Sequence, residues 1–357
     1  MKQTISITKA TQPKPRPTDE TRLGFGRLFT DHMFMMNYSS EQGWHDARIV
    51  PFDYIPVYPA STVFHYGTEI FEGMKAYRTK EGRVQMFRPL ENVRRMNISA
   101  ERLCLPQLDE AFALHALETL ITLEQDWVPR LEGTSLYIRP FMYGDDPHLG
   151  VHAVECATFV IICSPVGAYY PEGMNPVKIA IESEDVRAVR GGTGYTKCGG
   201  NYAASLRAGQ RAQKMGYTQV LWLDGVERKY IEEVGSMNVM FKIGGEIVTP
   251  ALTGSVLPGI TRKSCIALLR EWGYTVTERL ISIDELKQAA DDGRLEEAWG
   301  TGTAAVVSPI GQLFYLDETH TINHNQIGPV TQRLYDQLTA IQWGKVPDTH
   351  GWCHPVC

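Results

Sequence analysis

The sequence lacks both a long apolar segment and an excess of positive charge. No run of apolar residues approaches the roughly 20 that a membrane-spanning helix requires. Aspartate and glutamate number 41 against 35 lysines and arginines, which gives a formal net charge of −6. A mildly acidic chain offers nucleic acid or an anionic membrane no electrostatic reason to bind. We therefore predict that the chain binds neither nucleic acid nor a membrane.

Cysteine pairs with the spacing of a metal site or a redox motif are also missing. The chain has seven cysteines, an odd number, and no C-x-x-C, which argues against a disulfide framework. The stretch HGWCHPVC (350–357) matches no zinc pattern, so we predict no metal site and expect a frayed end there. Residues 1–20 lack the apolar stretch of a secretory signal. These absences together predict a cytoplasmic protein with reduced thiols.

The length and the order of the patterns predict two domains. A chain of 357 residues exceeds one typical core. The first part alternates strands and helices, whereas the second has helices of its own and a hairpin with a Gly244-Gly245 turn. A Gly- and Pro-rich stretch, GAYYPEGMNP (167–176), separates the two parts. We predict an α/β fold made of a mobile N-terminal arm (1–20), a small α/β domain (21–168), a linker (169–190) and a large domain (191–357).

One lysine, Lys197, stands among the glycines of GGTGYTKCGGNYAAS (191–205). A phosphate-binding P-loop needs Ser or Thr after its lysine, and here Cys198 follows. A dinucleotide fingerprint fails as well, because Lys197 occupies the position of the third glycine. Two interpretations stay open: an ordinary solvated loop lysine, and a lysine that forms a Schiff base with a flat cofactor.

Two other stretches supply groups that a pyridoxal phosphate site requires. LPGITR (257–262) opens a helix, and its first N–H groups, near Ile260 and Thr261, form an anion site. Glu232 and Glu233 project to opposite faces of a strand, so that one of them can face a cofactor ring. The alternatives are an ordinary helix start and two solvated carboxylates.

Several motifs, in this order, resemble those of branched-chain amino acid aminotransferases, which are fold-type-IV pyridoxal phosphate enzymes. They are FEGMKAY (71–77), SLYIRP (135–140), GGNYAAS (199–205), QVLWLDG (219–225), EEVGSMN (232–238), LPGITR and GTGTAAVVSP (300–309). The resemblance implies two α/β domains with the cofactor in the cleft between them, held in the large domain, and a homodimer. It also implies transfer of the amino group of L-leucine, L-isoleucine or L-valine to 2-oxoglutarate, giving 2-oxo acids and L-glutamate.

Three alternatives to this function are kept. A D-amino acid aminotransferase or an aminodeoxychorismate lyase would have the same fold and cofactor but another substrate. A nucleotide-binding protein built on the glycine loops would belong to another class altogether.

The resemblance assigns cofactor contacts residue by residue. Lys197 is the Schiff-base lysine and proton shuttle, Glu233 pairs with the pyridine nitrogen, and Tyr202 donates to the phenolic oxygen of the ring. The remaining cofactor contacts are Arg95, the backbone of Ile260 and Thr261 and the hydroxyl of Thr303, all at the phosphate, and Ser236 near cofactor or substrate. From its position alone, Arg95 would be interpreted as a solvated helix arginine.

The resemblance also implies a substrate pocket. Its apolar and aromatic lining consists of Phe29, Tyr66, Phe71, Tyr137, Tyr169 and Ala304, with Leu149 and Val151 reaching across from a second subunit. Arg139 lies two residues after Tyr137, on the same face of a strand. It can donate a charged hydrogen bond to the distal carboxylate of glutamate, or it can be a structural residue in a buried ion pair. Ala305 and Ser308 replace the redox C-x-x-C of mammalian relatives, so we expect no thiol regulation there.

Overall fold

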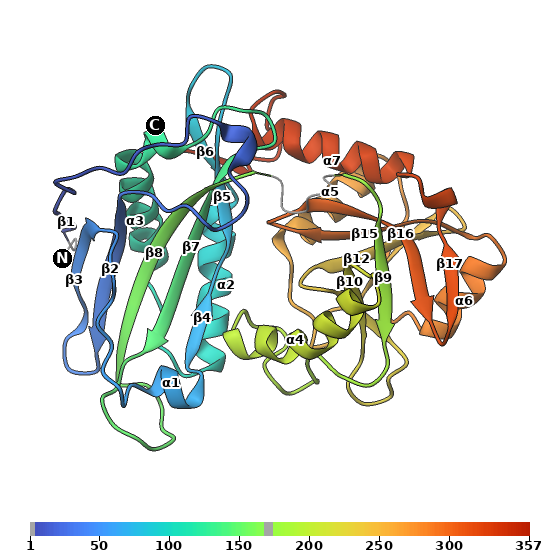
Figure 1. Ribbon diagram of the computed structural model, residues 1–357, viewed down its shortest axis with the longest axis horizontal. Helices are drawn as coiled ribbons and strands as arrows, with labels where there is room; N and C mark the ends of the chain where they lie inside the picture. The colour runs from blue at the N-terminus through green and yellow to red at the C-terminus, as the bar shows by residue number, and fades with distance from the viewer. Residues whose placement is uncertain (1–3, 168–173) are drawn as a thin grey trace. The chain divides into compact units, whose positions relative to one another are not determined.

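The computed structural model describes residues 4–167 and 174–357. The chain divides into two compact units (Figure 1). The first comprises Met1–Tyr169, Thr196–Gly199 and Ala340–Cys357, and the second comprises Tyr170–Tyr195 and Gly200–Thr339. This division differs from the expected one, because the large domain was expected to hold all of residues 191–357. The segment with Lys197 and residues 340–357 belong instead to the first unit.

The first unit contains a mostly antiparallel sheet in the order β1-β3-β2-β8-β7-β5-β6-β18, with β4 paired to β7. Its strands are β1 (Ser6–Ile7), β2 (His32–Ser39), β3 (Gly43–Pro51), β4 (Glu69–Phe71), β5 (Met74–Arg78), β6 (Val84–Phe87), β7 (Ser135–Gly144), β8 (Cys156–Val166) and β18 (Cys353–Pro355). The helices are α1 (Thr62–Tyr66), α2 (Pro89–Arg102) and α3 (Glu110–Leu123), with 3-10 turns at Glu20–Arg22 and Gln125–Trp127.

Helices α2 and α3 cover one face of this sheet (Figure 1). Helix α2 starts with Pro89 in its first turn and buries Val93, Met96 and Ala100, a spacing of three and four residues that forms one helical face. In α3, the Asp109 side chain caps the helix by accepting a hydrogen bond from the Phe112 N–H at 2.7 Å. The core of the first unit therefore lies between these helices and the sheet.

Both ends of the chain are attached to the first unit. Ser6–Ile7 pairs in parallel with β3, and the N–H of Ala10 donates to the Nε2 atom of His32 at 2.8 Å. At the other end, β18 pairs with β6 and places Cys353 opposite Phe87. The expectations of a mobile arm and a frayed C-terminal end are therefore wrong for these residues. Both contacts join residues far apart in the sequence, and each strand is too short to show a periodic pattern.

The second unit contains a mixed sheet in the order β11-β10-β9-β16-β15-β12-β13-β14, with β17 paired to β16. Its strands are β9 (Val177–Glu182), β10 (Gln219–Leu223), β11 (Ile231–Val234), β12 (Asn238–Ile243), β13 (Glu246–Pro250), β14 (Val276–Arg279), β15 (Leu295–Gly302), β16 (Val306–Tyr315) and β17 (Glu318–Thr321). The helices are α4 (Gly199–Lys214), α5 (Ile260–Glu271), α6 (Ile283–Asp291) and α7 (Pro329–Gln342), with a 3-10 turn at Asn323–Asn325.

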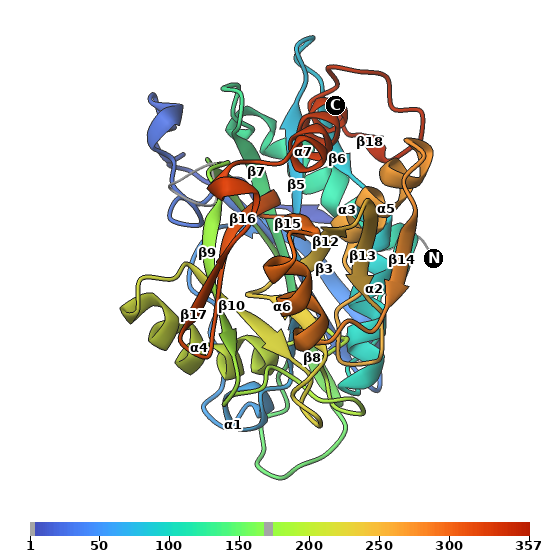
Figure 2. The same cartoon turned by 90° about the vertical axis from the view of Figure 1, so that its right-hand side faces the viewer.

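Local signals in the second unit correspond to its elements. Gly244 and Gly245 have φ angles of 56° and 83°, the left-handed conformation that a tight turn between β12 and β13 requires. The Ser282 side chain caps α6 by accepting from the Glu285 N–H. Helix α6 packs against the sheet and buries Ile283, Leu286 and Ala289 in its core (Figure 2). The predicted α/β fold class is confirmed. Among the described residues, no helix is long and apolar enough to cross a membrane.

Candidate active site

The Lys197 segment is fixed to the first unit by its backbone. The carbonyl of Lys197 accepts from the Phe71 N–H and its N–H donates to the Ser99 hydroxyl, both at 2.9 Å. Two residues on, the Gly199 N–H donates to the Glu69 carboxylate at 3.0 Å. A Cβ atom at Gly199 would lie 2.6 Å from that carboxylate, so a larger residue would have to displace the Glu69 side chain from this contact. The ammonium nitrogen of Lys197 lies 4.7 Å from the centre of the Phe71 ring.

Arg139 approaches the same aromatic ring. Its guanidinium carbon lies 4.6 Å from the centre of the Phe71 ring, and its Nη2 atom donates to the Tyr137 hydroxyl at 2.9 Å. The Nε atom is buried without a hydrogen-bond partner within residues 4–167 and 174–357. Burial raises the pKa of the nearby Glu69 carboxyl, while the Gly199 N–H, Arg139 and Lys197 oppose the shift. Phe71 thus contacts both cations, and Arg139 forms no ion pair within the described residues.

Arg95 is buried rather than solvated, in contrast to what its position in the sequence indicates. Its Nε and Nη2 atoms donate to the two oxygens of Glu72 at 2.7 and 2.9 Å, and Asn92 donates to the same carboxylate at 2.8 Å. Burial is the largest influence and would raise the pKa of Glu72, but Arg95, Lys197 and Asn92 together lower that pKa. The contact between Arg95 and the cofactor phosphate stays a prediction.

The other expected pocket residues of the first unit are more dispersed. Phe29 stacks on Phe52, with ring centres 4.8 Å apart. Tyr66 is 40% exposed, and its hydroxyl accepts from the Gly150 N–H at 2.8 Å. Leu149 and Val151 are 64% and 86% exposed, so their side chains are open to a further contact. Tyr169 lies outside the described residues.

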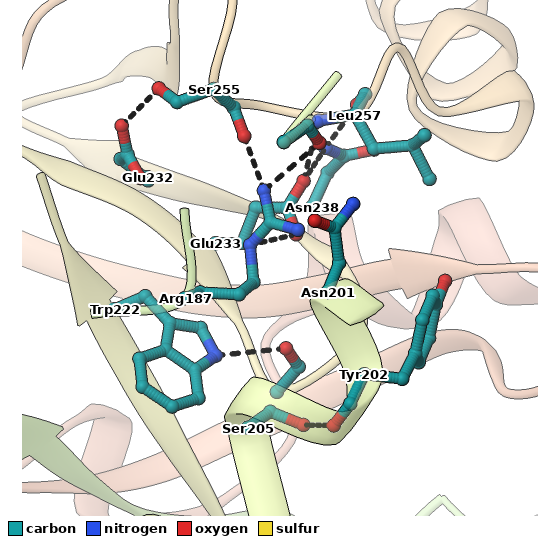
Figure 3. Close-up of polar contacts among 12 residues, drawn as sticks. Arg187, Asn201, Tyr202, Ser205, Trp222, Glu232, Glu233, Asn238, Ser255 and Leu257 are labelled. Carbon is teal, nitrogen blue, oxygen red and sulfur yellow. Dashed lines mark hydrogen bonds and ion pairs between the residues drawn. The ribbon is translucent and has the colours of Figure 1, made fainter. Parts of the chain in front are cut away.

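In the second unit, Glu233 is buried and held from two sides (Figure 3). One carboxylate oxygen accepts from the Leu257 N–H at 2.7 Å, and Asn238 approaches the same oxygen at 3.5 Å. The other oxygen lies 3.2 Å from the Nε atom of Arg187, which is itself buried. The Glu233 carboxylate is therefore held by a backbone donor and a buried arginine.

Glu232 points to the opposite side of β11 but is not solvated. It is only 5% exposed, and the Ser255 hydroxyl donates to its carboxylate. Burial raises the pKa of Glu232 to about 7. The alternative of two solvated carboxylates is therefore wrong. Arg187 and Ser255 were not recognised from the sequence, because each meets its glutamate across more than twenty residues of chain and neither belongs to a motif.

Two predicted phosphate contacts, Ile260 and Thr261, follow shortly after Leu257, whose N–H donates to Glu233. Helix α5 starts at Ile260, three residues after Leu257, and its N-cap residue is Gly259, which has no side chain that could cap the first N–H groups. Strand β12 pairs Asn238 with Thr301 of β15, so the turn that holds Thr303 and Ala304 extends toward exposed Ser236. Tyr202 lies half-buried in the first turn of α4.

Comparison with known proteins shows the family to which the chain belongs. The family model described as amino-transferase class IV matches residues 69–313. The chain is 56% identical over 355 residues to "Branched-chain-amino-acid aminotransferase 2" of Bacillus subtilis (strain 168), covering 99% of this chain and 98% of the relative.

Two solved structures are similar in fold. One is a branched-chain amino acid aminotransferase of Escherichia coli, with a TM-score of 0.76, 27% identity, and coverage of 92% of this chain and 99% of that one. The other is a branched-chain amino acid aminotransferase of T.th. with pyridoxamine 5'-phosphate, with a TM-score of 0.76, 28% identity, and coverage of 91% and 98%. The chain therefore belongs to the class IV aminotransferases, in the family of the branched-chain amino acid aminotransferases.

Proposed function

We propose that the chain is a homodimeric cytoplasmic transaminase that moves the amino group of L-leucine, L-isoleucine or L-valine to 2-oxoglutarate, with pyridoxal phosphate as its cofactor. The observation that carries the proposal is the buried Glu233 carboxylate, fixed by Leu257 and Arg187 beside the uncapped start of α5. The name of the Bacillus relative and the pyridoxamine 5'-phosphate of the T.th. structure support the substrates and the cofactor.

The residues present fit this cofactor. A buried carboxylate suits a protonated ring nitrogen, and uncapped helix N–H groups suit a phosphate. When bound, pyridoxal phosphate would supply an aldehyde carbon that exchanges its oxygen for the amino group and a ring that takes up the electrons released at the substrate Cα. Glu233 then holds a proton at the ring nitrogen, and the Tyr202 hydroxyl donates to the ring oxygen. Arg95, Ile260, Thr261 and Thr303 bind the phosphate, with Ser236 beside them.

Lys197 provides the amine that removes and returns the proton at the substrate Cα. Its segment is anchored by three backbone hydrogen bonds, so the flexible part is the side chain alone. The neighbouring Phe71 ring limits the directions in which that side chain can extend. Such positioning places a base within reach of a defined carbon atom.

Arg139 is assigned to the distal carboxylate of glutamate and 2-oxoglutarate. It has an unpaired, buried Nε atom and no ion pair within the described part of the chain, which favours a ligand over a structural role. Phe71 and Tyr137 offer apolar surface to a leucine side chain at the same place. The proposed lining also includes Phe29, Tyr66, Tyr169 and Ala304. A second subunit would add Leu149 and Val151.

The absorption spectrum of the purified protein with pyridoxal phosphate tests this proposal. We expect a yellow protein whose spectrum changes on addition of L-leucine and is restored by 2-oxoglutarate. A response to D-amino acids only would identify a D-amino acid aminotransferase, and release of pyruvate from aminodeoxychorismate would identify the lyase. A colourless protein that takes up no pyridoxal phosphate but retains a nucleotide would overturn the proposal.

A further inference from the structure

A continuous series of polar contacts connects Glu232 to Glu233 (Figure 3). The Ser255 hydroxyl donates to Glu232, and the backbone carbonyl of the same serine accepts from the Nη2 atom of Arg187. The Nε atom of Arg187 then lies 3.2 Å from Glu233. All four residues are at most 8% exposed, so water screens these charges poorly.

Glu232 is only partly satisfied in this network. Its Oε2 atom is buried and has no hydrogen-bond partner among the described residues. Burying an ionised carboxylate in which one oxygen accepts no hydrogen bond costs more free energy than burying a protonated carboxyl. Three charged groups act on it: Arg187 after β9 favours the ionised form, while Glu233 on β11 and Asp224 after β10 oppose it. Burial is the largest influence, and the resulting pKa of about 7 means that both forms are populated near neutral pH.

The charge of Glu232 changes what Glu233 can do. When Glu232 is ionised, two carboxylates share the single positive charge of Arg187. When Glu232 is protonated or absent, Arg187 neutralises Glu233 alone. A carboxylate that is neutralised more completely is a weaker partner for a proton on a neighbouring group. The proton affinity at the site of Glu233 should therefore follow the ionisation of Glu232.

We propose that Glu232 is a positioning residue that acts through Ser255 and Arg187 on Glu233, and that its ionised form strengthens the hold of Glu233 on a proton at the cofactor ring nitrogen. This inference rests on the proposed function, because it assigns that ring nitrogen to Glu233. Glu232 itself touches neither cofactor nor substrate. It makes the strength of the Glu233 contact adjustable around neutral pH.

The first test is a pH titration of the absorption spectrum of the holoenzyme. Glu232→Gln keeps the shape of the side chain and removes its charge, and Ser255→Ala removes the hydrogen bond that favours the ionised form of Glu232. Glu227→Gln is the matched control, since Glu227 is exposed in the turn before β11. We expect the midpoint of the spectral transition to move toward acid by at least about half a pH unit in Glu232→Gln. The shift should be smaller in Ser255→Ala and absent in Glu227→Gln.

The second readout is kinetic. Because the interaction acts at the ring nitrogen, we expect kcat for leucine to fall about three- to tenfold in Glu232→Gln with little change in KM. A purely structural role would instead reduce the amount of folded enzyme and leave the pH dependence unchanged.

The third readout needs no cofactor. When the pKa of an acid is higher in the folded than in the unfolded state, the free energy of unfolding decreases as the pH rises between these two pKa values. The melting temperature of the cofactor-free protein should therefore decline, relative to Glu232→Gln, between about pH 5 and pH 7.5. Glu227→Gln should follow the wild-type protein.

The outcomes separate the two proposals. If wild-type protein takes up pyridoxal phosphate but Glu232→Gln and Glu227→Gln titrate identically, the inference fails and the proposed function stands. If wild-type protein takes up no pyridoxal phosphate, both fail. Should Glu232→Gln not fold, Ser255→Ala decides, and an unshifted spectrum in that variant overturns the inference.

Discussion

At the scale of single residues, Lys197 differs from a surface lysine in its backbone. Both its N–H and its carbonyl are hydrogen-bonded to other segments, and the side chain extends beside an aromatic ring. The backbone position of Lys197 is thus fixed, whereas the backbone of a lysine in a solvated loop would vary. This fits a group that must reach one carbon atom reproducibly.

Replacement of Lys197 by alanine should abolish turnover. Without the amine, no base remains to move the proton at Cα, so we expect kcat to fall by at least about a thousandfold. Cofactor should still bind through its phosphate contacts, which equilibrium dialysis would measure. Lys214→Ala, an exposed lysine at the end of α4, is the control. Turnover near the wild-type rate in Lys197→Ala would exclude this lysine as the base.

Arg139→Met tests how one pocket accepts both an apolar side chain and a carboxylate. Methionine keeps much of the volume of the stem and removes the charge. A charged hydrogen bond contributes roughly 1.5–3 kcal/mol, so kcat/KM for 2-oxoglutarate should fall at least about tenfold more than that for leucine. Arg94→Met, an exposed arginine of α2, should change neither value. Equal losses for both substrates would show that Arg139 is structural.

At the scale of elements, the start of α5 combines a close approach with an uncapped helix end. A Cβ atom at Gly259 would lie 1.8 Å from the Oδ1 atom of Asn238, and Asn238 donates to the Leu257 carbonyl at 2.9 Å. The same loop holds Glu233 through the Leu257 N–H. One glycine therefore sets how closely Asn238, the first residue of β12, approaches the helix that offers its N–H groups.

Gly259→Ala should displace Asn238 and loosen this loop. We expect a stability loss of about 1–3 kcal/mol, as for overpacked sites, together with weaker binding of pyridoxal phosphate. Gly209→Ala is a suitable comparison, because Gly209 lies inside α4 with nothing near its Cβ position. That variant should be neutral or up to about 1 kcal/mol more stable, since alanine favours a helix. Thermal unfolding and cofactor titration of both variants check this, and equal behaviour would contradict the argument.

The pairing of β18 with β6 gives a prediction about the C-terminal residues. Removal of residues 353–357 should expose the edge of β6 and leave the Val84 N–H, which donates to the Cys357 carbonyl, without that partner. We expect the melting temperature to fall by about 4–8 °C, the equivalent of roughly 2 kcal/mol. The double variant Cys353→Ser and Cys357→Ser keeps the backbone pairing and should melt within about 2 °C of the wild-type protein. A truncated chain of unchanged stability would show that the strand contributes nothing.

Most elements could be predicted from the sequence, because their signals are local. Pro89, Gly244, Gly245 and Ser282 each act within a few residues of their own position. The pairings of Ser6–Ile7 and Cys353–Pro355 could not be predicted, since they depend on partners far along the chain. The site divides in the same way. Motif residues such as Lys197 were assigned by the resemblance of their motifs to a known family, whereas Arg187 and Ser255 are defined only by the three-dimensional contact with a glutamate.

At the scale of the whole molecule, the homodimer stays a prediction. Exposed apolar side chains provide a way to test it. Leu149 and Val151 are both largely exposed in the loop between β7 and β8. If they contact a second subunit, the double change Leu149→Glu and Val151→Glu should convert the dimer to monomer at micromolar concentration and lower turnover. Leu316→Glu introduces the same charge at a site that is 67% exposed, and serves as the control. Light scattering that shows unchanged mass in the double variant would exclude this contact.

The composition of the first unit has a consequence for how the protein is made. Its sheet takes an edge strand from Cys353–Pro355, and its Lys197 segment comes from residues 196–199. Both follow most of the first unit in the chain, and β18 follows the entire second unit as well. On the ribosome, the unit whose synthesis starts first is therefore the last to be completed. Until residues 353–355 emerge, the backbone of β6 remains an open sheet edge, and chaperones or a neighbouring nascent chain can bind it.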